Sequence, residues 1–305
     1  MKLRLGTRGS ALATTQSRMV ADSLVLAAAE RGVELEVELV SITTHGDVAR
    51  GSVAGLSEVG VFVNALRTAV LEGECDLVVH SLKDMPTAPH PELSLAAIPV
   101  REDARDALCA RGATLAELPP RPTVGTGSPR RSAQVLALRP DAVVVPVRGN
   151  VDTRLALAAD ELDAVVLAIA GLNRLGRADE ASHVFDPEDM LPAPGQGALA
   201  VEIGPDASDE LAMLVGALDD ADARAAVTAE RAALAVLDAG CTAPMGAHAT
   251  VTDGVLALHA RVLRPDGLLV LNETARGRPE DAASIGRQLG HALLGRGAAM
   301  LMGRA

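Results

Sequence analysis

Two consecutive strand–turn–helix units in residues 125–154 place the strongest constraint on how this chain can fold. The stretch reads GTGSPRRSAQVLALRPDAVVVPVRGNVDTR, and its Gly and Ser-Pro residues are typical of a helix start. The apolar run Ala142–Val147 indicates a buried strand, and the turn at Arg148–Asn150 leads into a second helix. Strands alternate with helices along residues 3–203 as well, which predicts parallel, doubly wound sheets.

Arginines stand at the starts of the expected helices. Arg130 and Arg131 fall in the first turn of one helix, and Arg148 and Arg154 flank the start of the next. Cations are disfavoured at a helix N-terminus, whereas a bound anion would be held by the free N–H groups, the helix dipole and the arginines together. Because the net charge of the chain is -12, we interpret this cluster as a carboxylate or phosphate site. The alternative is a solvated basic face or a set of ion pairs with Asp and Glu.

Three further strand ends carry charged residues. Arg8 and Arg174 each follow an expected strand. Lys83 and Asp84 follow the buried strand Asp76–His80, at the edge of an open α/β sheet where ligands bind. An Asp among cations stays ionised, so Asp84 could stabilise a cationic intermediate or transfer a proton. The alternative is a helix-capping Asp beside a surface Lys.

The composition excludes several classes of protein. Apolar residues make up 49% of the chain, but Trp and Tyr are absent and Phe occurs twice. Base stacking on aromatic side chains and attraction to a phosphate backbone are therefore not expected, which argues against nucleic acid as a partner. No apolar run is long enough for a membrane span, and the N-terminus lacks the apolar region of a secretory signal. We expect a cytoplasmic protein.

The three cysteines differ in their surroundings. Cys75 and Cys109 border or lie within apolar strands, so both are expected to be small buried hydrophobes. Cys241 lies in GCTAPMG, a loop with Gly and Pro on both sides, where it could be a nucleophile or an attachment point. No histidine adjoins Cys241, and no residues have the spacing of metal ligands.

The order of elements predicts three domains. Val100–Asp103 reads as a crossing into a second domain, and the Pro/Gly-rich segment Leu191–Gly197 as the return, so that Ala198–Ile203 adds a strand to the first domain. The C-terminal residues predict a three-stranded antiparallel meander with helices. The expected domains are residues 1–98 with 197–217, residues 99–196, and residues 218–305.

Eight segments together resemble the porphobilinogen deaminase (hydroxymethylbilane synthase) family. In chain order they are LRLGTRGSALATTQ, VHSLKDMPT, REDARDAL, VGTGSPRR, VRGNVDTR, AIAGLNRLG, LPAPGQGAL and GCTAPMG. The resemblance implies two α/β domains like those of type 2 periplasmic binding proteins, joined by a two-stranded hinge. A small α+β C-terminal domain with a three-stranded antiparallel sheet would follow them.

The resemblance also implies a transferase of porphyrin, tetrapyrrole and heme biosynthesis. Such an enzyme joins four porphobilinogen molecules head to tail, with loss of ammonia, onto a dipyrromethane cofactor. It then releases hydroxymethylbilane by hydrolysis. The cofactor would be attached to Cys241 through a thioether. The partners implied are porphobilinogen and the growing linear pyrrole chain, with no nucleic acid and no membrane, and the enzyme is expected to be a monomer.

The site residues follow from the matching motifs. Asp84 matches the catalytic carboxylate, which would stabilise an azafulvene-type cation by accepting hydrogen bonds from pyrrole N–H groups. The residues implied in cofactor binding, besides Cys241, are Lys83, Asp84, Ser128, Arg130, Arg131, Arg148, Asn150 and Arg154. Those implied in substrate binding are Arg8, Ser10, Arg148, Arg154, Arg174, Gln196 and Phe62. No metal is implied.

Departures from the family pattern lie mainly in residues 45–60, read as a mobile loop. His45 stands where Arg is often found, the stretch before Phe62 lacks lysine, and Gly127 replaces a residue that can carry a hydroxyl. Two other functions compete with the enzyme. A non-catalytic carboxylate-binding protein on the same scaffold would leave Asp84 and Cys241 without a role. An effector-binding regulator would need a DNA-reading module, and none is evident.

Overall fold

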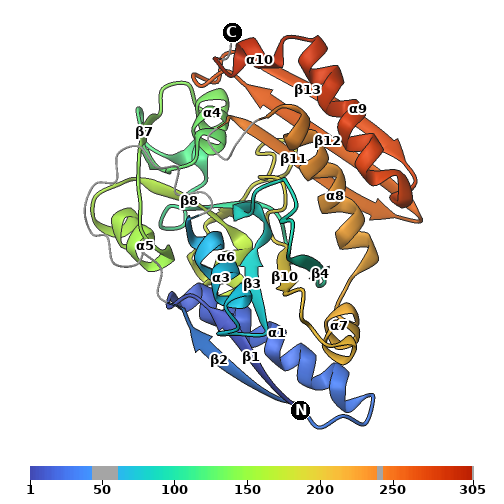
Figure 1. Ribbon diagram of the computed structural model, residues 1–305. Coiled ribbons are helices and arrows are strands. Elements are labelled where there is room, and N and C mark those ends of the chain that lie inside the picture. Colours follow the sequence, from blue (N-terminus) through green and yellow to red (C-terminus); the bar gives the residue numbers. More distant parts are fainter. Residues whose placement is uncertain (43–60, 239–242, 304–305) are drawn as a thin grey trace. The chain divides into compact units, whose positions relative to one another are not determined.

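The computed structural model describes residues 1–42, 61–238 and 243–303, with the helices and strands labelled in Figure 1. The described residues form two compact units. The first unit is Met1–Arg101 with Ala198–Ala221, and the second is Glu102–Gly197 with Asp222–Ala305. The finer division into three domains stays a prediction.

A five-stranded sheet forms the centre of the first unit, in the order β2-β1-β3-β10-β4. β1 is parallel to β2 and β3, whereas β10 is antiparallel to β3 and to β4. The strands are β1 (Lys2–Thr7), β2 (Glu36–Ser41), β3 (Leu77–Ser81), β4 (Ser94–Ala97) and β10 (Leu199–Ile203). The helices are α1 (Ala11–Ala29), α3 (Val61–Leu71), α7 (Asp209–Gly216) and the 3-10 turn η1 (Leu82–Asp84).

Side-chain alternation along β3 gives this sheet two apolar faces. Leu77 and Val79 join a core with residues of α1 and α7, while Val78 joins a second core with residues of α3. This is the pattern of a strand covered on both faces, and it explains why β3 reads as a continuous apolar run. The same alternation places His80 on the α3 face, at the end of the strand that leads into η1.

The second unit contains a sheet with the equivalent strand order, β7-β6-β8-β5-β9. β6 is parallel to β7 and β8, and β5 is antiparallel to β8 and β9. The strands are β5 (Asp106–Cys109), β6 (Thr123–Gly125), β7 (Val143–Val145), β8 (Ala164–Ala168) and β9 (His183–Val184). The helical elements are η2 (Leu115–Glu117), α4 (Pro129–Leu138), α5 (Val151–Asp160), α6 (Ile169–Arg174) and η3 (Ala178–Glu180).

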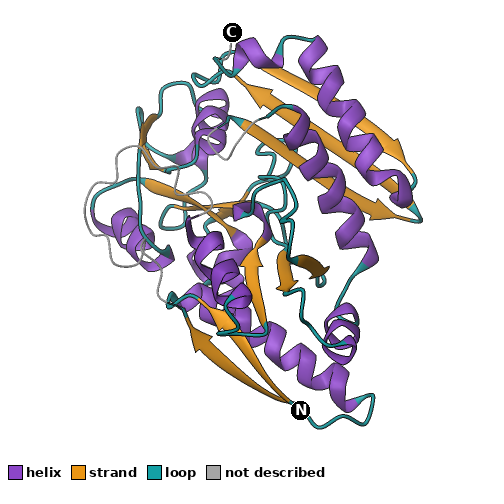
Figure 2. Cartoon of the chain, viewed as in Figure 1, coloured by secondary structure: helices purple, strands orange, loops and turns teal. Residues whose placement is uncertain are grey.

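The C-terminal part of the second unit is an antiparallel sheet packed against two long helices (Figure 2). Its elements are α8 (Ala221–Val236), β11 (Met245–Thr252), β12 (Val255–Leu263), β13 (Val270–Gly277), η4 (Pro279–Asp281), α9 (Ala282–Gly295) and α10 (Ala298–Leu301). Small residues allow α8 and α9 to approach closely: a Cβ on Gly286 would lie 2.2 Å from the Ala229 carbonyl oxygen. Alanine makes up much of this core, and its small side chain lets the helices and the sheet pack closely without large aromatic residues.

The expected fold class is confirmed: the structure contains two α/β sheets and a three-stranded antiparallel sheet. Two finer predictions are wrong. The α/β sheets are mixed rather than parallel, because β5 and β10, the first strands after the crossings at 101/102 and 197/198, run against their neighbours. The run Ala142–Val147 is not a buried strand, because β7 is an edge strand with one neighbour and Val143 is 40% exposed.

Across residues 1–42, 61–238 and 243–303, no helix combines the length and apolar character needed to cross a membrane.

Candidate active site

The start of α4 holds two of the predicted arginines inside the protein. Ser128 is the N-cap residue, its hydroxyl accepting from the Arg131 N–H at 3.5 Å, and Pro129 occupies the first turn. Arg130 and Arg131 therefore fall in the first turn, as the sequence predicts. Their side chains are only 4% and 6% exposed, so they are not part of a solvated basic face.

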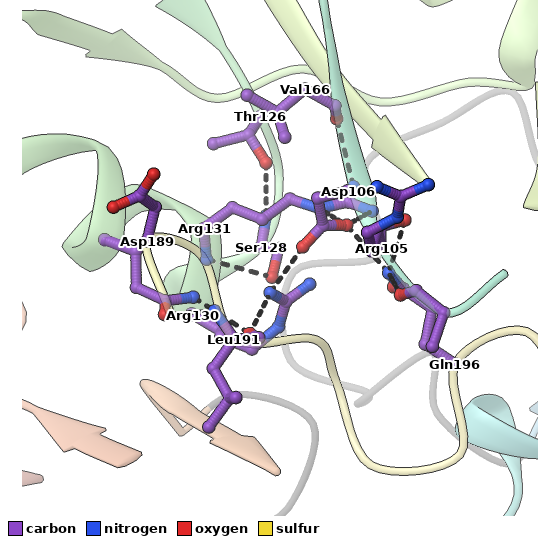
Figure 3. A network of polar contacts seen from close by, with 12 residues as sticks. Arg105, Asp106, Thr126, Ser128, Arg130, Arg131, Val166, Asp189, Leu191 and Gln196 are labelled. Carbon is purple, nitrogen blue, oxygen red and sulfur yellow. Dashed lines mark hydrogen bonds and ion pairs between the residues drawn. The ribbon is translucent and has the colours of Figure 1, made fainter. Parts of the chain in front are cut away.

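Asp106, the first residue of β5, is the shared counter-ion of both arginines (Figure 3). Arg130 Nη1 donates to Asp106 Oδ2 at 2.6 Å, and Arg131 donates to Oδ1 from Nε at 3.0 Å and from Nη2 at 2.7 Å. Burial favours a raised pKa for Asp106, but the two guanidinium groups outweigh it and hold this pKa well below its usual range. The carboxylate is thus charged and holds both guanidinium groups in place, so the ion-pair alternative describes Arg130 and Arg131.

Gln196 joins this network from the return segment. Its side-chain N–H groups donate to Asp106 Oδ1 at 2.8 Å and to the Ala104 carbonyl at 2.7 Å. The backbone around it requires glycine, because φ is +85° at Gly197 and an added Cβ would lie 2.3 Å from the Glu102 carbonyl oxygen. The GQG motif therefore lies against the first residues of the second unit, with the Glu102 N–H donating to the Gly197 carbonyl at 3.3 Å.

Among the buried guanidinium N–H groups of the second unit, two lack an acceptor within the described part of the chain. They are Nε of Arg130, whose Nη1 also donates to the Leu191 carbonyl at 2.7 Å, and Nε of Arg174, whose Nη2 donates to the Gly197 carbonyl at 2.7 Å. A buried donor without a partner is costly, so an acceptor is expected at each. Guanidinium groups pair well with carboxylates, so a ligand that carries carboxylates would satisfy these donors.

The start of α5 presents the other arginines of the cluster differently. Asn150 is the N-cap residue, and its Oδ1 accepts from the Thr153 N–H at 2.9 Å and hydroxyl at 2.8 Å. Arg154 Nε donates to the Gly149 carbonyl at 2.9 Å, whereas Arg148 is exposed. A helix-capping role thus occupies the amide oxygen of Asn150, and its contact with the cofactor stays a prediction.

The first unit carries the remaining described candidates. Ser10 caps α1, its Oγ accepting from the Ala13 N–H at 3.3 Å, and the half-buried Arg8 precedes it. Lys83 and Asp84 lie in η1, where Lys83 is half-buried and Asp84 is exposed. Asp84 is the last residue of this turn, so it is not the N-cap residue that the alternative interpretation requires.

Other predicted residues lie outside the described structure. They are Cys241, the segment 43–60 with His45, and the side chain of Phe62, whose backbone belongs to α3. The other two cysteines are buried as expected: Cys75 is 2% and Cys109 3% exposed. Burial raises the pKa of each thiol to about 11, so neither is a reactive thiolate.

Asp106 lies within the REDARDAL motif, and the sequence motifs alone assign it no role. The available signal was a carboxylate at the start of a strand that is otherwise apolar, because such a carboxylate needs a cation once it is buried. The structure also explains Gly127: an added Cβ there would lie 2.7 Å from the Val147 carbonyl oxygen, so a larger residue would require the turn to shift.

Comparisons with known proteins cover nearly the whole chain. A family model described as porphobilinogen deaminase, dipyromethane cofactor binding domain, matches residues 3–212, and one described as porphobilinogen deaminase, C-terminal domain, matches residues 224–295. A curated porphobilinogen deaminase of Leifsonia xyli is 51% identical, over 98% of this chain and 94% of its own length. That of Thermobifida fusca is 52% identical, over 99% and 96%.

Similar solved structures are more distant. Lipoprotein Tp32 of Treponema pallidum is 12% identical with a TM-score of 0.44, over 70% of this chain and 88% of its own. An ancestral cationic amino acid solute binding protein is 17% identical with a TM-score of 0.41, over 71% and 87%. The family matches and the two relatives at about half identity decide the assignment: this chain belongs to the porphobilinogen deaminase family.

Proposed function

We propose that the protein is a hydroxymethylbilane synthase, which joins four porphobilinogen molecules head to tail with loss of ammonia and then releases hydroxymethylbilane. The observation that carries this function is the match of both family domains, over residues 3–212 and 224–295. The non-catalytic carboxylate-binding protein is not favoured, because the relatives that match over the full length are named as deaminases.

The second unit contributes the groups that orient carboxylates. A dipyrromethane cofactor, bound through the Cys241 sulfur, would be the primer to which pyrrole units are added, and it carries carboxylates of its own. Arg130 and Arg174 each have a buried Nε–H that suits such a carboxylate. Asp106 holds the guanidinium groups of Arg130 and Arg131 in one orientation. Ser128, Arg148, Asn150 and Arg154 are proposed to bind further carboxylates.

The first unit contributes the proposed catalytic group. Asp84 is exposed at the end of η1, where its carboxylate oxygens can accept hydrogen bonds from pyrrole N–H groups. There it would stabilise the positive charge that develops as ammonia leaves, and then accept the proton that the substrate loses. Lys83, Arg8 and Ser10 are proposed to bind carboxylates beside it. Phe62 and Gln196 are proposed to contact substrate.

We also propose that the enzyme acts as a monomer in the cytoplasm. Both cysteines with described side chains, Cys75 and Cys109, are unpaired, which is usual in a reducing compartment. Light scattering after size-exclusion chromatography tests the monomer, since a mass twice that of the chain would contradict it. Cell fractionation with an antibody to the protein tests the compartment.

Intact mass before and after addition of porphobilinogen tests the function and the attachment site together. We expect a mass above the bare chain by two linked pyrrole units, located on the Cys241 peptide, and further one-unit steps with substrate. Cys241→Ser should remain bare, whereas the matched control Cys75→Ser should carry the added mass. A wild-type protein that stays bare, even after incubation with preformed hydroxymethylbilane, would refute the proposed function.

A further inference from the structure

Three buried polar side chains lie between α3 and the sheet of the first unit, in a layer that is otherwise apolar. They are Arg67 from α3, His80 from β3 and Glu202 from β10. The exposed fractions of the three residues are 5%, 5% and 2%, respectively. The rest of this layer is a cluster of buried apolar side chains that includes Leu66 and Val78.

Glu202 is the centre of this triad. Arg67 donates from Nε to Glu202 Oε2 at 2.8 Å and from Nη2 to Oε1 at 2.7 Å, in the bidentate arrangement typical of a strong pair. His80 Nε2 lies 3.1 Å from Glu202 Oε2, in close polar contact but without the alignment of a hydrogen bond. Burial favours a raised pKa for Glu202, but His80 and Arg67 outweigh it and lower this pKa to about 2. Glu202 is therefore ionised at neutral pH.

The triad connects three elements at the end of β3 that leads to Asp84. In the antiparallel pairing of β3 with β10, His80 lies opposite Ala200, and Glu202 lies opposite Val78. The next turn is fixed from β10 as well, because the Leu82 N–H donates to the Ala198 carbonyl at 3.0 Å. The triad thus links α3 and β10 to β3, the strand that leads into η1.

Stability alone does not account for such a triad. Replacing a buried ion pair by apolar side chains of similar volume is often neutral or stabilising, and the surrounding layer is already apolar. A bidentate pair differs from an apolar contact in that it holds its partners in one orientation. A fixed orientation matters here because Lys83 and Asp84, which follow β3, must be placed accurately.

We propose that Arg67, His80 and Glu202 are positioning residues for the turn that carries Lys83 and Asp84. They hold the end of β3 in one position against α3 and β10, and so hold the Asp84 carboxylate where it meets the reacting pyrrole. The inference rests on the proposed function, in which Asp84 is the catalytic group. None of the three residues is required to contact substrate.

The first test separates stability from turnover. The triple variant Arg67→Met, His80→Leu, Glu202→Leu should keep the urea midpoint and the covalently bound pyrrole units of the wild type. Its kcat should fall at least about tenfold with KM for porphobilinogen little changed, because displacements of about 1 Å cost up to about 100-fold in rate. The matched control is Arg4→Met, which breaks an ion pair with Asp76 at the opposite end of β3 and should leave kcat unchanged.

A second test leaves the Arg67–Glu202 pair intact and does not depend on how the triple variant folds. His80→Leu should lower kcat, and His80→Gln, which again places an N–H near Glu202, should restore most of it. Wild-type kcat in His80→Leu, or in a folded triple variant, would overturn the inference while the proposed function stands. A wild-type protein that neither carries pyrrole units nor consumes porphobilinogen would overturn both.

Discussion

Asp106→Asn tests whether the buried carboxylate holds the arginine cluster together. The substitution removes the only negative charge that the described structure places against Arg130 and Arg131, and it turns an amide N–H toward their donors. Breaking a buried ion pair by removing one partner costs about 3–5 kcal/mol. With a denaturant slope of about 2–3 kcal/mol per molar urea, the midpoint for unfolding of the second unit should fall by about 1–2.5 M.

The dependence on pH distinguishes a charge effect from a packing effect. The pKa of Asp106 is lowered in the folded state, so its stabilisation is fully present above its unfolded pKa of about 3.9. This contribution is lost as the pH falls further, toward the folded pKa. The difference in urea midpoint between wild type and Asp106→Asn should therefore be constant from about pH 5 to 8 and shrink below about pH 4.

Circular dichroism during urea titration is the assay, and Asp103→Asn is the matched control. Asp103 pairs with Arg105 at 2.6 Å, but these side chains are 26% and 45% exposed, so its loss should cost at most about 1 kcal/mol. Asp106→Asn should also lower the fraction of protein that carries the pyrrole cofactor, measured by intact mass. Equal midpoints for Asp106→Asn and Asp103→Asn would refute the reasoning.

Three further predictions follow from single residues. Asp84→Asn should keep the circular dichroism spectrum and the bound pyrrole units but lower kcat for porphobilinogen consumption by about 10²–10⁴-fold, and a near-normal rate would remove Asp84 from the mechanism. Gly197→Ala should lower the urea midpoint by more than Gly216→Ala, because only Gly197 has a positive φ and a carbonyl within 2.3 Å of the added Cβ. Cys75 and Cys109 should react with a thiol reagent at pH 8 only after unfolding, because burial raises their pKa to about 11, and fast labelling of either in the native protein would contradict this.

Local features of the fold could be predicted well from the sequence. Ser128 caps the helix that the Ser-Pro sequence predicts, and the strands expected at Asp76–His80 and Ala198–Ile203 lie close to β3 and β10. Caps and apolar runs depend on neighbouring residues, so a single sequence contains their signal. The burial of Cys75 and Cys109 was predicted on the same basis.

Features that depend on the three-dimensional arrangement could not be predicted in this way. An apolar run does not say how many neighbours a strand has, so β7 was expected to be buried although it is an edge strand. Strand direction in β5 and β10 depends on where the chain enters each unit. The counter-ion of Arg130 lies 24 residues away, at Asp106, and the partner of Arg67 lies 135 residues away, at Glu202. No local pattern specifies such pairs.

The strand order of the two sheets has a consequence for folding during synthesis. All five strands of the second unit's α/β sheet lie within residues 106–184, whereas the sheet of the first unit includes β10, an interior strand at residues 199–203. Residues 1–98 leave the ribosome first, yet β4 has no partner until β10 is made. We therefore expect the later-synthesised sheet to close first, while the N-terminal strands keep unpaired edges and depend on chaperones. A truncated chain that ends just after residue 190, once released from the ribosome, should resist protease in residues 106–184 and be cleaved within residues 1–98.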